Sequence, residues 1–138
     1  MSDSGVDESG ANSLIRLIDA NINRLKEGLR VLEDISRYVH SNRDLSYRLK
    51  ELRHMAQKGY DIKMLEKRDA RGDILKKSTS SEMKRRGLED LIIANFSRAQ
   101  ESSRVLEEAF KLLDTTLSEH YKNIRYELYD LEKHLLNP

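Results

Sequence analysis

The chain has 138 residues, of which 38% are hydrophobic and 36% charged, and its formal net charge is +1. This length fits one domain with a modest core, and the near-neutral charge gives no general attraction to nucleic acid or to a membrane. The absence of cysteine excludes disulfides and thiolate metal sites. No apolar run approaches a membrane span and no signal-peptide pattern begins the chain, so we expect a cytoplasmic location.

The first half of the chain predicts a tail followed by a helical hairpin. Residues 1–13 are small, polar and acidic, which is typical of a disordered tail. The hairpin is expected over residues 14–58, with a turn at residues 41–44. Its first helix has apolar residues at alternating steps of four and three, if Ser36 is counted: Ile18, Ile22, Leu25, Leu29, Leu32 and Val39. Gly28 in mid-helix indicates either neutral drift or the close approach of another backbone or a ligand.

The second half predicts a charged connection and another hairpin. Residues 59–78 have weak periodicity and dense charge, which favours a flexible charged loop over a ligand-binding one. The hairpin is expected over residues 79–136, with capping boxes that begin its helices at Thr79 and Thr116. The apolar seam of its first helix repeats that of the earlier one: Ile92, Phe96, Ala99, Ser103, Leu106, Phe110 and Leu113.

One pattern occurs twice, at residues 20–33 and again at residues 94–107. Both copies read Ala-Asn-x-x-Arg-x-x-Glu-x-x-Arg-Val-Leu-Glu, so their polar residues coincide as well as their apolar ones. An exposed ladder of ion pairs would explain each copy, but it needs neither Asn nor Arg in place of Lys. Because arginine offers a planar fork suited to carboxylate and phosphate, the repetition favours a functional site.

The repeat extends to the second helix of each hairpin, where Arg53 matches Arg125. The predicted fold is therefore all-α: a four-helix bundle made of two duplicated helical hairpins, related by pseudo-twofold symmetry, in a single domain over residues 14–138. Because the first helix of each hairpin carries two seams, one of them partly polar, we also expect a homo-oligomer.

The doubled pattern, together with Asp19 before it and the closing stretch at residues 124–132, resembles a known family. This is the small all-helical, non-ribokinase type of hydroxymethylpyrimidine phosphate kinase, which occurs alone or fused to thiamine phosphate synthase. The central stretch from Arg68 to Asp73 is similar to the family's loop, although Ile74, Leu75 and Lys76 replace the small residue, Gly and Thr with which the family tends to continue. The resemblance implies ATP-dependent phosphorylation of hydroxymethylpyrimidine phosphate to the diphosphate in thiamine biosynthesis, with ATP and Mg²⁺.

The resemblance and chemical suitability together give each polar group an expected role. The arginines of the doubled pattern are the candidate catalytic residues: Arg24, Arg30, Arg98 and Arg104. Candidate substrate-binding residues are Asn21, Asn95, Glu27, Glu101, Arg53 and Arg125, where the two glutamates would hold the arginines in place. Arg68 and Gly72 are expected to bind the nucleotide, and Asp69 and Asp73 to hold Mg²⁺.

An alternative function is a non-catalytic helical interaction or regulatory module associated with thiamine phosphate synthase, which is then the expected partner. Arginines of both copies converging on a cavity would favour the enzyme, and arginines spread over the surface would favour the module. In either case the expected partners exclude nucleic acid and membranes; the enzyme takes a phosphorylated pyrimidine.

Overall fold

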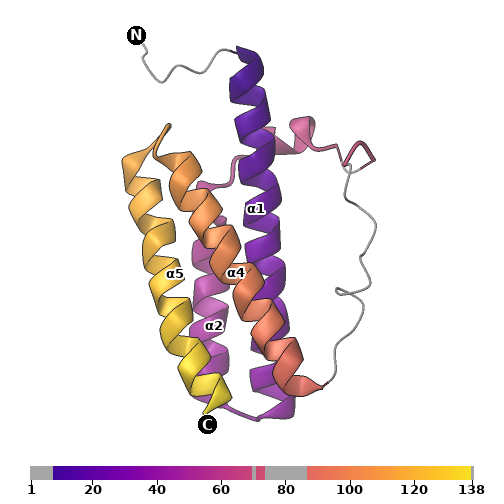
Figure 1. Cartoon of the computed structure of the whole chain (residues 1–138), viewed down its shortest axis with the longest axis vertical. Helices are drawn as coiled ribbons and strands as arrows, with labels where there is room; N and C mark the ends of the chain where they lie inside the picture. Colours follow the sequence, from indigo (N-terminus) through magenta and orange to yellow (C-terminus); the bar gives the residue numbers. More distant parts are fainter. Residues whose placement is uncertain (1–7, 70, 74–86, 138) are drawn as a thin grey trace.

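The computed structural model describes residues 8–69, 71–73 and 87–137, and all regular secondary structure in these ranges is helical. This confirms the predicted all-α class. Four long helices dominate it (Figure 1): α1 (Glu8–Asp34), α2 (Arg43–Ala56), α4 (Leu88–Phe110) and α5 (Thr115–Leu136). Three short elements connect them: a π-helical turn η1 (Ile35–Val39) and two 3₁₀ segments, η2 (Gln57–Gly59) and η3 (Ile62–Lys67). No helix within the described ranges is long and apolar enough to span a membrane.

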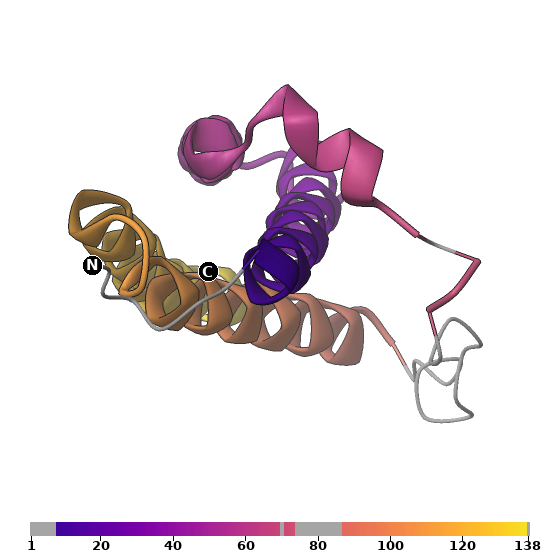
Figure 2. The ribbon, with the colours of Figure 1, turned by 90° about the horizontal axis from the view of Figure 1, so that it is seen from above.

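Helices α1 and α4 form the centre of the fold. Seen from above, α1 lies nearly end-on and α4 runs across it, while α2 and α5 lie on the outer sides (Figure 2). The two central helices approach closely at Gly28, where an added Cβ would lie 3.2 Å from the Asn95 carbonyl oxygen and 3.6 Å from the Ala99 Cβ. Of the alternatives that the sequence left open at Gly28, the structure shows the close approach of another backbone. Because α4 covers this side of α1 within the chain, the second seam does not require another subunit, and the homo-oligomer stays a prediction.

The predicted apolar seams form the core, with two exceptions at helix ends. Ile18, Ile22, Leu25, Leu29 and Leu32 are at most 1% exposed. Val39 is 58% exposed, because α1 continues into the π-helical turn η1, whose extra residue per turn rotates Val39 away from the core. Leu113 is 52% exposed, because α4 has already ended at Phe110.

Several boundaries differ from those expected. Helix α1 begins at Glu8 and not at residue 14; once a helix is nucleated, further residues add at little cost. Thr116 was expected to cap the last helix, which is wrong: the Asp114 carboxylate accepts the N–H groups of Thr116 at 2.9 Å and Leu117 at 3.2 Å. The capping box expected at Thr79 and residues 74–78 of the charged connection lie outside the described residues.

The end of α2 is bound to α5 through Tyr121. The buried hydroxyl of Tyr121 donates to the Ala56 carbonyl at 2.7 Å and accepts the Gly59 N–H at 3.0 Å. Its ring stacks on Phe110 with centroids 5.5 Å apart. A Cβ at Gly59 would lie 2.8 Å from the Phe110 ring, so the turn after α2 has no room for a side chain. Burial raises the pKa of Tyr121 to about 12, partly opposed by the Gly59 N–H.

Two interactions occur in the same form in both halves of the chain. The Asn21 side chain donates to the Leu17 carbonyl at 2.8 Å, and Asn95 donates to the carbonyl of residue 91 at 2.9 Å. The glutamate that ends each copy of the pattern pairs with the matching arginine of the next helix: Glu33 with Arg53 and Glu107 with Arg125, both at 2.8 Å. These repeated contacts support the duplication. The outer helices differ in length, with 14 residues in α2 and 22 in α5, and the pseudo-twofold symmetry stays a prediction.

Replacing Tyr121 with phenylalanine keeps the ring and removes both hydrogen bonds. We expect Tyr121→Phe to lower the free energy of unfolding by about 1–3 kcal/mol, because two buried backbone groups lose their partner. Denaturant unfolding at pH 7 measures this. Tyr47→Phe, at a residue 63% exposed, is the matched control and should stay within about 0.5 kcal/mol of wild type. Equal unfolding midpoints for all three proteins would contradict the role of the hydroxyl.

The same pair of proteins has an expected pH dependence. The pKa of Tyr121 is raised from 10.0 to about 12 in the folded state, so the protonated hydroxyl is favoured by folding. Its contribution to stability is therefore fully present below pH 10 and is lost as the pH rises through about 12. The stability difference between wild type and Tyr121→Phe should narrow over this interval; a constant difference would contradict the assignment.

Two buried serines should respond oppositely to the same substitution. The Ser36 hydroxyl is buried in η1 without a hydrogen-bond partner among the described residues, whereas the Ser118 hydroxyl donates to the Glu107 carbonyl at 2.8 Å. We expect Ser36→Ala to stabilise the protein by up to about 1 kcal/mol and Ser118→Ala to destabilise it by about as much. Thermal unfolding of both variants measures the difference. A loss of stability in Ser36→Ala as large as that in Ser118→Ala would show that Ser36 makes a bond the structure lacks.

Candidate functional site

The two asparagines of the doubled pattern are turned toward their own helices. Each amide donates to the carbonyl four residues earlier, and Asn21 is only 5% exposed. The amide nitrogen of each is therefore engaged inside the helix. Neither asparagine lines the two pockets described below, so the structure does not bring them to a ligand site as the sequence predicted.

Arg53 and Arg125 are held by buried carboxylates. Arg53 Nε donates to Glu33 at 2.8 Å, and Arg125 donates through Nε and Nη2 to the same Glu107 oxygen at 3.1 and 2.8 Å. The side chains of Arg125 and Glu107 are 10% and 7% exposed. Each pair joins the two helices of its hairpin. Removing one partner would leave the other charge buried and unpaired, which is strongly unfavourable, so the pairs keep these helices together.

The other arginines of the pattern extend from the surface. Arg30 pairs with Asp34 at 3.7 Å and Arg104 with Glu108 at 3.0 Å, and all four side chains are about half exposed. Arg24 and Arg98 form no ion pair with a described residue. Glu27 and Glu101 likewise form none, so the expectation that they hold the flanking arginines is wrong. Asp34 and Glu108, each four residues after its arginine, pair with Arg30 and Arg104 instead.

A polar pocket of about 670 Å³ lies between α1 and the segment that follows η3. We name it the α1–loop pocket; its lining is Ser13, Arg16, Leu17, Asp19, Ala20, Asn23, Arg24, Glu27, Arg68, Asp69, Gly72 and Asp73. Three arginines and four carboxylates therefore surround one cavity. Residues far apart in the sequence meet here, because η3 packs along α1 and returns the chain to its first turns.

The Asp19 carboxylate forms the most tightly bonded part of this pocket. Arg68 Nε donates to Asp19 Oδ2 at 2.9 Å and Arg68 Nη2 to Oδ1 at 2.8 Å, which is the two-pronged geometry of a guanidinium on a carboxylate. Asp19 is 3% exposed, whereas the Arg68 side chain is 40% exposed. The hydrogen bonds to Asp19 raise the pKa of Arg68 further above its ordinary value, so the pocket keeps this cation.

The loop wall of the pocket is shaped by Asp69 and Gly72. The Gly72 N–H donates to Asp69 Oδ1 at 2.8 Å, which closes a tight turn. An added Cβ at Gly72 would lie 2.2 Å from Asp69 Oδ2, so a side chain here would displace this carboxylate. Asp69 and Asp73 thus come from one turn and face one cavity.

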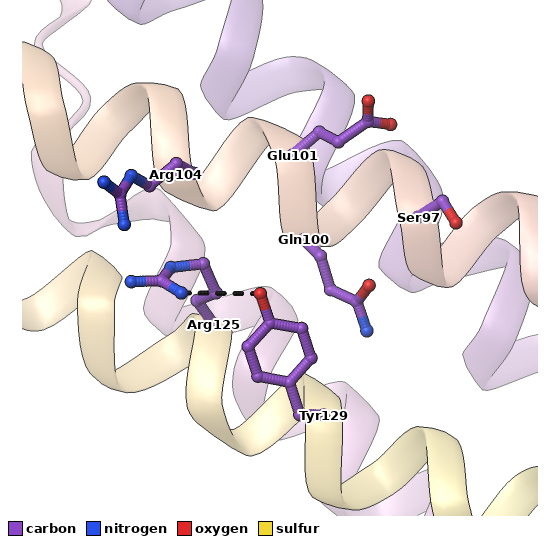
Figure 3. A pocket seen from close by; sticks show the side chains of 6 residues that line it. All are labelled: Ser97, Gln100, Glu101, Arg104, Arg125 and Tyr129. Atoms are coloured by element: carbon purple, nitrogen blue, oxygen red, sulfur yellow. Dashed lines mark hydrogen bonds between the residues drawn. The ribbon is translucent and has the colours of Figure 1, made fainter.

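A second polar pocket, of about 530 Å³, lies between α4 and α5 (Figure 3). We name it the α4–α5 pocket; its lining is Ser97, Gln100, Glu101, Arg104, Arg125 and Tyr129. Arg125 Nη1 donates to the Tyr129 hydroxyl at 3.4 Å, and its guanidinium lies 5.0 Å from the centre of the Tyr126 ring. The hydrogen bonds to Tyr129 and to Glu107 raise the pKa of Arg125 above its ordinary value.

The predicted site residues are divided among three places. The α1–loop pocket contains Arg24, Glu27, Arg68, Asp69, Gly72 and Asp73. The α4–α5 pocket contains Glu101, Arg104 and Arg125. Neither pocket contains Arg30, Arg98, Asn21, Asn95 or Arg53. The duplicated pattern therefore does not form one shared site within the chain.

Sequence reasoning missed Asp19, Arg16 and Asn23 in the α1–loop pocket and Tyr129 in the other. Asp19 was overlooked because the matching residue in the second copy is Ile93, and coincidence between copies was the criterion. A usable signal existed: Asp19 and Asn23 are four residues apart, on one face of α1, and their side chains are 3.4 Å apart.

Asp69 and Asp73, the residues predicted for Mg²⁺, fit an ion that is also coordinated by the phosphates of a bound nucleotide. Within the described residues, no group of three or more carboxylates or imidazoles is arranged to hold a metal on its own. Mg²⁺ is usually bound by one or two carboxylates together with phosphate oxygens and water. Asp69 and Asp73 supply that number in one pocket beside Arg68.

Comparison with known proteins identifies relatives. A sequence model of the ThiD2 family matches residues 16–134. The thiamine-phosphate synthase of Nostoc punctiforme is 35% identical over 122 residues, which are 88% of this chain and 35% of that protein. Those of Thermosynechococcus vestitus and Rhodopirellula baltica are 39% and 35% identical, over 94% and 86% of this chain and over 38% and 33% of their own lengths.

The chain spans about a third of the length of these relatives. No solved structure matches it.

The buried pair at the α4–α5 pocket should matter far more for stability than the exposed pair beside it. Glu107→Gln leaves Arg125 buried without its counter-charge, and we expect a loss of about 3 kcal/mol in the free energy of unfolding. Glu108→Gln is the matched control at the next residue, with a half-exposed side chain, and should cost less than about 1 kcal/mol. Chemical denaturation of both variants measures the difference, and similar losses would contradict the burial argument.

Proposed function

Because the chain belongs to the ThiD2 family, we propose that it transfers a phosphoryl group from ATP to hydroxymethylpyrimidine phosphate, giving the diphosphate, in thiamine biosynthesis. The place in thiamine biosynthesis is supported by relatives that are themselves thiamine-phosphate synthases. The phosphotransferase activity is supported by the sequence resemblance and by the chemistry of the α1–loop pocket.

One observation carries the proposal. The α1–loop pocket unites Arg24 and Glu27 of the first copy of the pattern with Arg68, Asp69 and Asp73 of the central connection. These two stretches were selected from the sequence for separate reasons. Their meeting in one cavity, with arginines and carboxylates together, is the arrangement that a nucleotide and its Mg²⁺ require.

The proposed reaction needs cations more than it needs a base. The acceptor is a phosphate monoester, whose second pKa of about 6 leaves it ionised at neutral pH. The entering oxygen therefore carries no proton that must be removed, but two highly charged phosphates have to approach one another. Positioning and charge stabilisation then supply most of the catalysis.

The residues of the α1–loop pocket have corresponding roles in this proposal. Arg16, Arg24 and Arg68 bind phosphate oxygens and stabilise the charge on the transferred group. Asp69 and Asp73 hold Mg²⁺, which neutralises charge on the nucleotide phosphates when it is bound. Glu27 lies on the same wall as Arg16 and Arg24. With three arginines and four carboxylates the lining has a formal charge of −1, which a bound Mg²⁺ would raise to +1. The pocket contains no histidine, which agrees with a reaction that needs no general base.

A second candidate is a non-catalytic helical module associated with thiamine phosphate synthase. Two observations favour it. The arginines of the two copies do not converge on one cavity, because Arg24 and Arg104 line different pockets. The relatives are also longer: the matched region is about a third of each, and the remainder is about twice as long. Arg30 and Arg98, which lie outside both pockets, also suit a surface that contacts another protein.

Incubation with ATP, Mg²⁺ and hydroxymethylpyrimidine phosphate tests the kinase, with the diphosphate measured by mass spectrometry. We expect product that depends on Mg²⁺ and on protein concentration. If no diphosphate forms while the protein binds thiamine phosphate synthase in analytical ultracentrifugation, the interaction module is the better description.

Arginine-to-lysine variants decide which pocket holds the phosphates. Arg24→Lys keeps the charge and loses the bidentate fork, so we expect kcat/KM to fall on the order of tenfold, as for one lost charge-assisted hydrogen bond. Arg43→Lys, on the exposed start of α2 and outside both pockets, is the matched control and should behave as wild type. A loss in Arg104→Lys without one in Arg24→Lys would contradict the assignment to the α1–loop pocket and favour the α4–α5 pocket.

A further inference from the structure

Asp19 combines features that separate it from the other acids of the α1–loop pocket. It is 3% exposed, whereas Glu27, Asp69 and Asp73 are exposed. Both of its oxygens accept hydrogen bonds from Arg68, at 2.9 and 2.8 Å, and the Asn23 amide lies 3.4 Å from Oδ1. A buried carboxylate is stable only with such partners, so Asp19 and Arg68 are constrained to stay together.

Helix packing does not explain an acid at this position. The matching residue in the second half of the chain is Ile93, which lies on α4 and is 39% exposed. The duplicated framework thus accepts an apolar residue here. The two halves differ in their surroundings, because η3 packs against α1, the helix that carries Asp19. The acid is present in the half that the central connection packs against.

The pair joins the two walls of the pocket, α1 and the segment that follows η3. Met64 in η3 is 8% exposed and packs in the core, which attaches the start of the connection. Arg68 comes directly after the end of η3 and attaches the chain to α1 again, directly before Asp69 and the Gly72 turn. The bond between Asp19 and Arg68 therefore attaches the chain to α1 at the residue directly before the Asp69 turn.

We propose that Asp19 is the positioning residue of the α1–loop pocket: it holds the Arg68 guanidinium and thereby places Asp69 and residues 71–73 for binding a nucleotide phosphate. This inference rests on the proposed kinase function for its catalytic consequence. Its structural consequence, the attachment of the segment to α1, is independent of any ligand.

Limited digestion with trypsin, without ligand, tests the attachment. The segment has cleavage sites at Lys67, Arg68 and Arg71. Asp19→Asn keeps the shape of the side chain and removes its charge, and Arg68→Lys keeps the charge and the cleavage site but loses the fork. In both variants we expect these sites to be cut at least about tenfold faster, the equilibrium effect of one lost charge-assisted hydrogen bond.

Asp130→Asn is the matched control. It also removes the carboxylate of an ion pair with an arginine, but this pair, between Asp130 and Arg48, is exposed. It should be cut at the wild-type rate. Cleavage of both Asp19→Asn and Arg68→Lys at the wild-type rate would overturn the proposal. If Asp19→Asn does not fold, Arg68→Lys decides alone, since it alters the 40% exposed partner and leaves the buried acid in place.

Steady-state kinetics tests the catalytic consequence. We expect Asp19→Asn and Arg68→Lys each to lower kcat by about tenfold at unchanged melting temperature, and the double variant to be no slower than either single one. Additive losses, or losses that follow the melting temperature, would overturn the positioning role. If wild-type protein forms no diphosphate, the proposed function fails, and the digestion still decides whether Asp19 holds the segment.

Discussion

The close crossing of α1 and α4 is the constraint on which the rest of the structure depends. Gly28 allows it, since a Cβ there would already lie 3.2 Å from the Asn95 carbonyl oxygen. At this distance the two central helices pack directly on each other, with α2 packed on α1 and α5 packed on α4. The crossing also turns the two copies of the doubled pattern to different surroundings. Arg24 consequently meets the central connection, while Arg104 meets α5.

The repeated polar residues have two kinds of purpose. Glu33 and Glu107 pair with Arg53 and Arg125 in buried positions, so their repetition reflects the joining of each hairpin. The asparagines bond within their own helices. These contacts need no ligand. The repetition that first suggested a binding site is therefore explained in large part by structure, and the candidate site arises where the two halves differ.

That difference is concentrated at Asp19. Its buried carboxylate has an isoleucine as its counterpart, and it binds an arginine from a connection that has no counterpart at all. The duplicated helices thus form a rigid scaffold, and the pocket lies beside Asp19, an acid that the other half of the chain lacks at the matching position. The proposed transfer between two phosphates depends on placing cations accurately, and the two-pronged bond to a buried acid holds one such cation, Arg68, in place.

The sequence by itself determined the helical class and the seam from Ile18 to Leu32, because periodicity is a local property of a helix. For Gly28 it left neutral drift and the close approach of a backbone or a ligand open, and the structure decided for the backbone of α4. It also selected six residues of the α1–loop pocket. Only the tertiary structure decided that Asp114 caps α5, that Val39 turns outward, and that Arg24 joins Arg68 while Arg104 does not. Such choices depend on which groups meet across helices, and spacing along one chain does not contain the angle at which α1 and α4 cross.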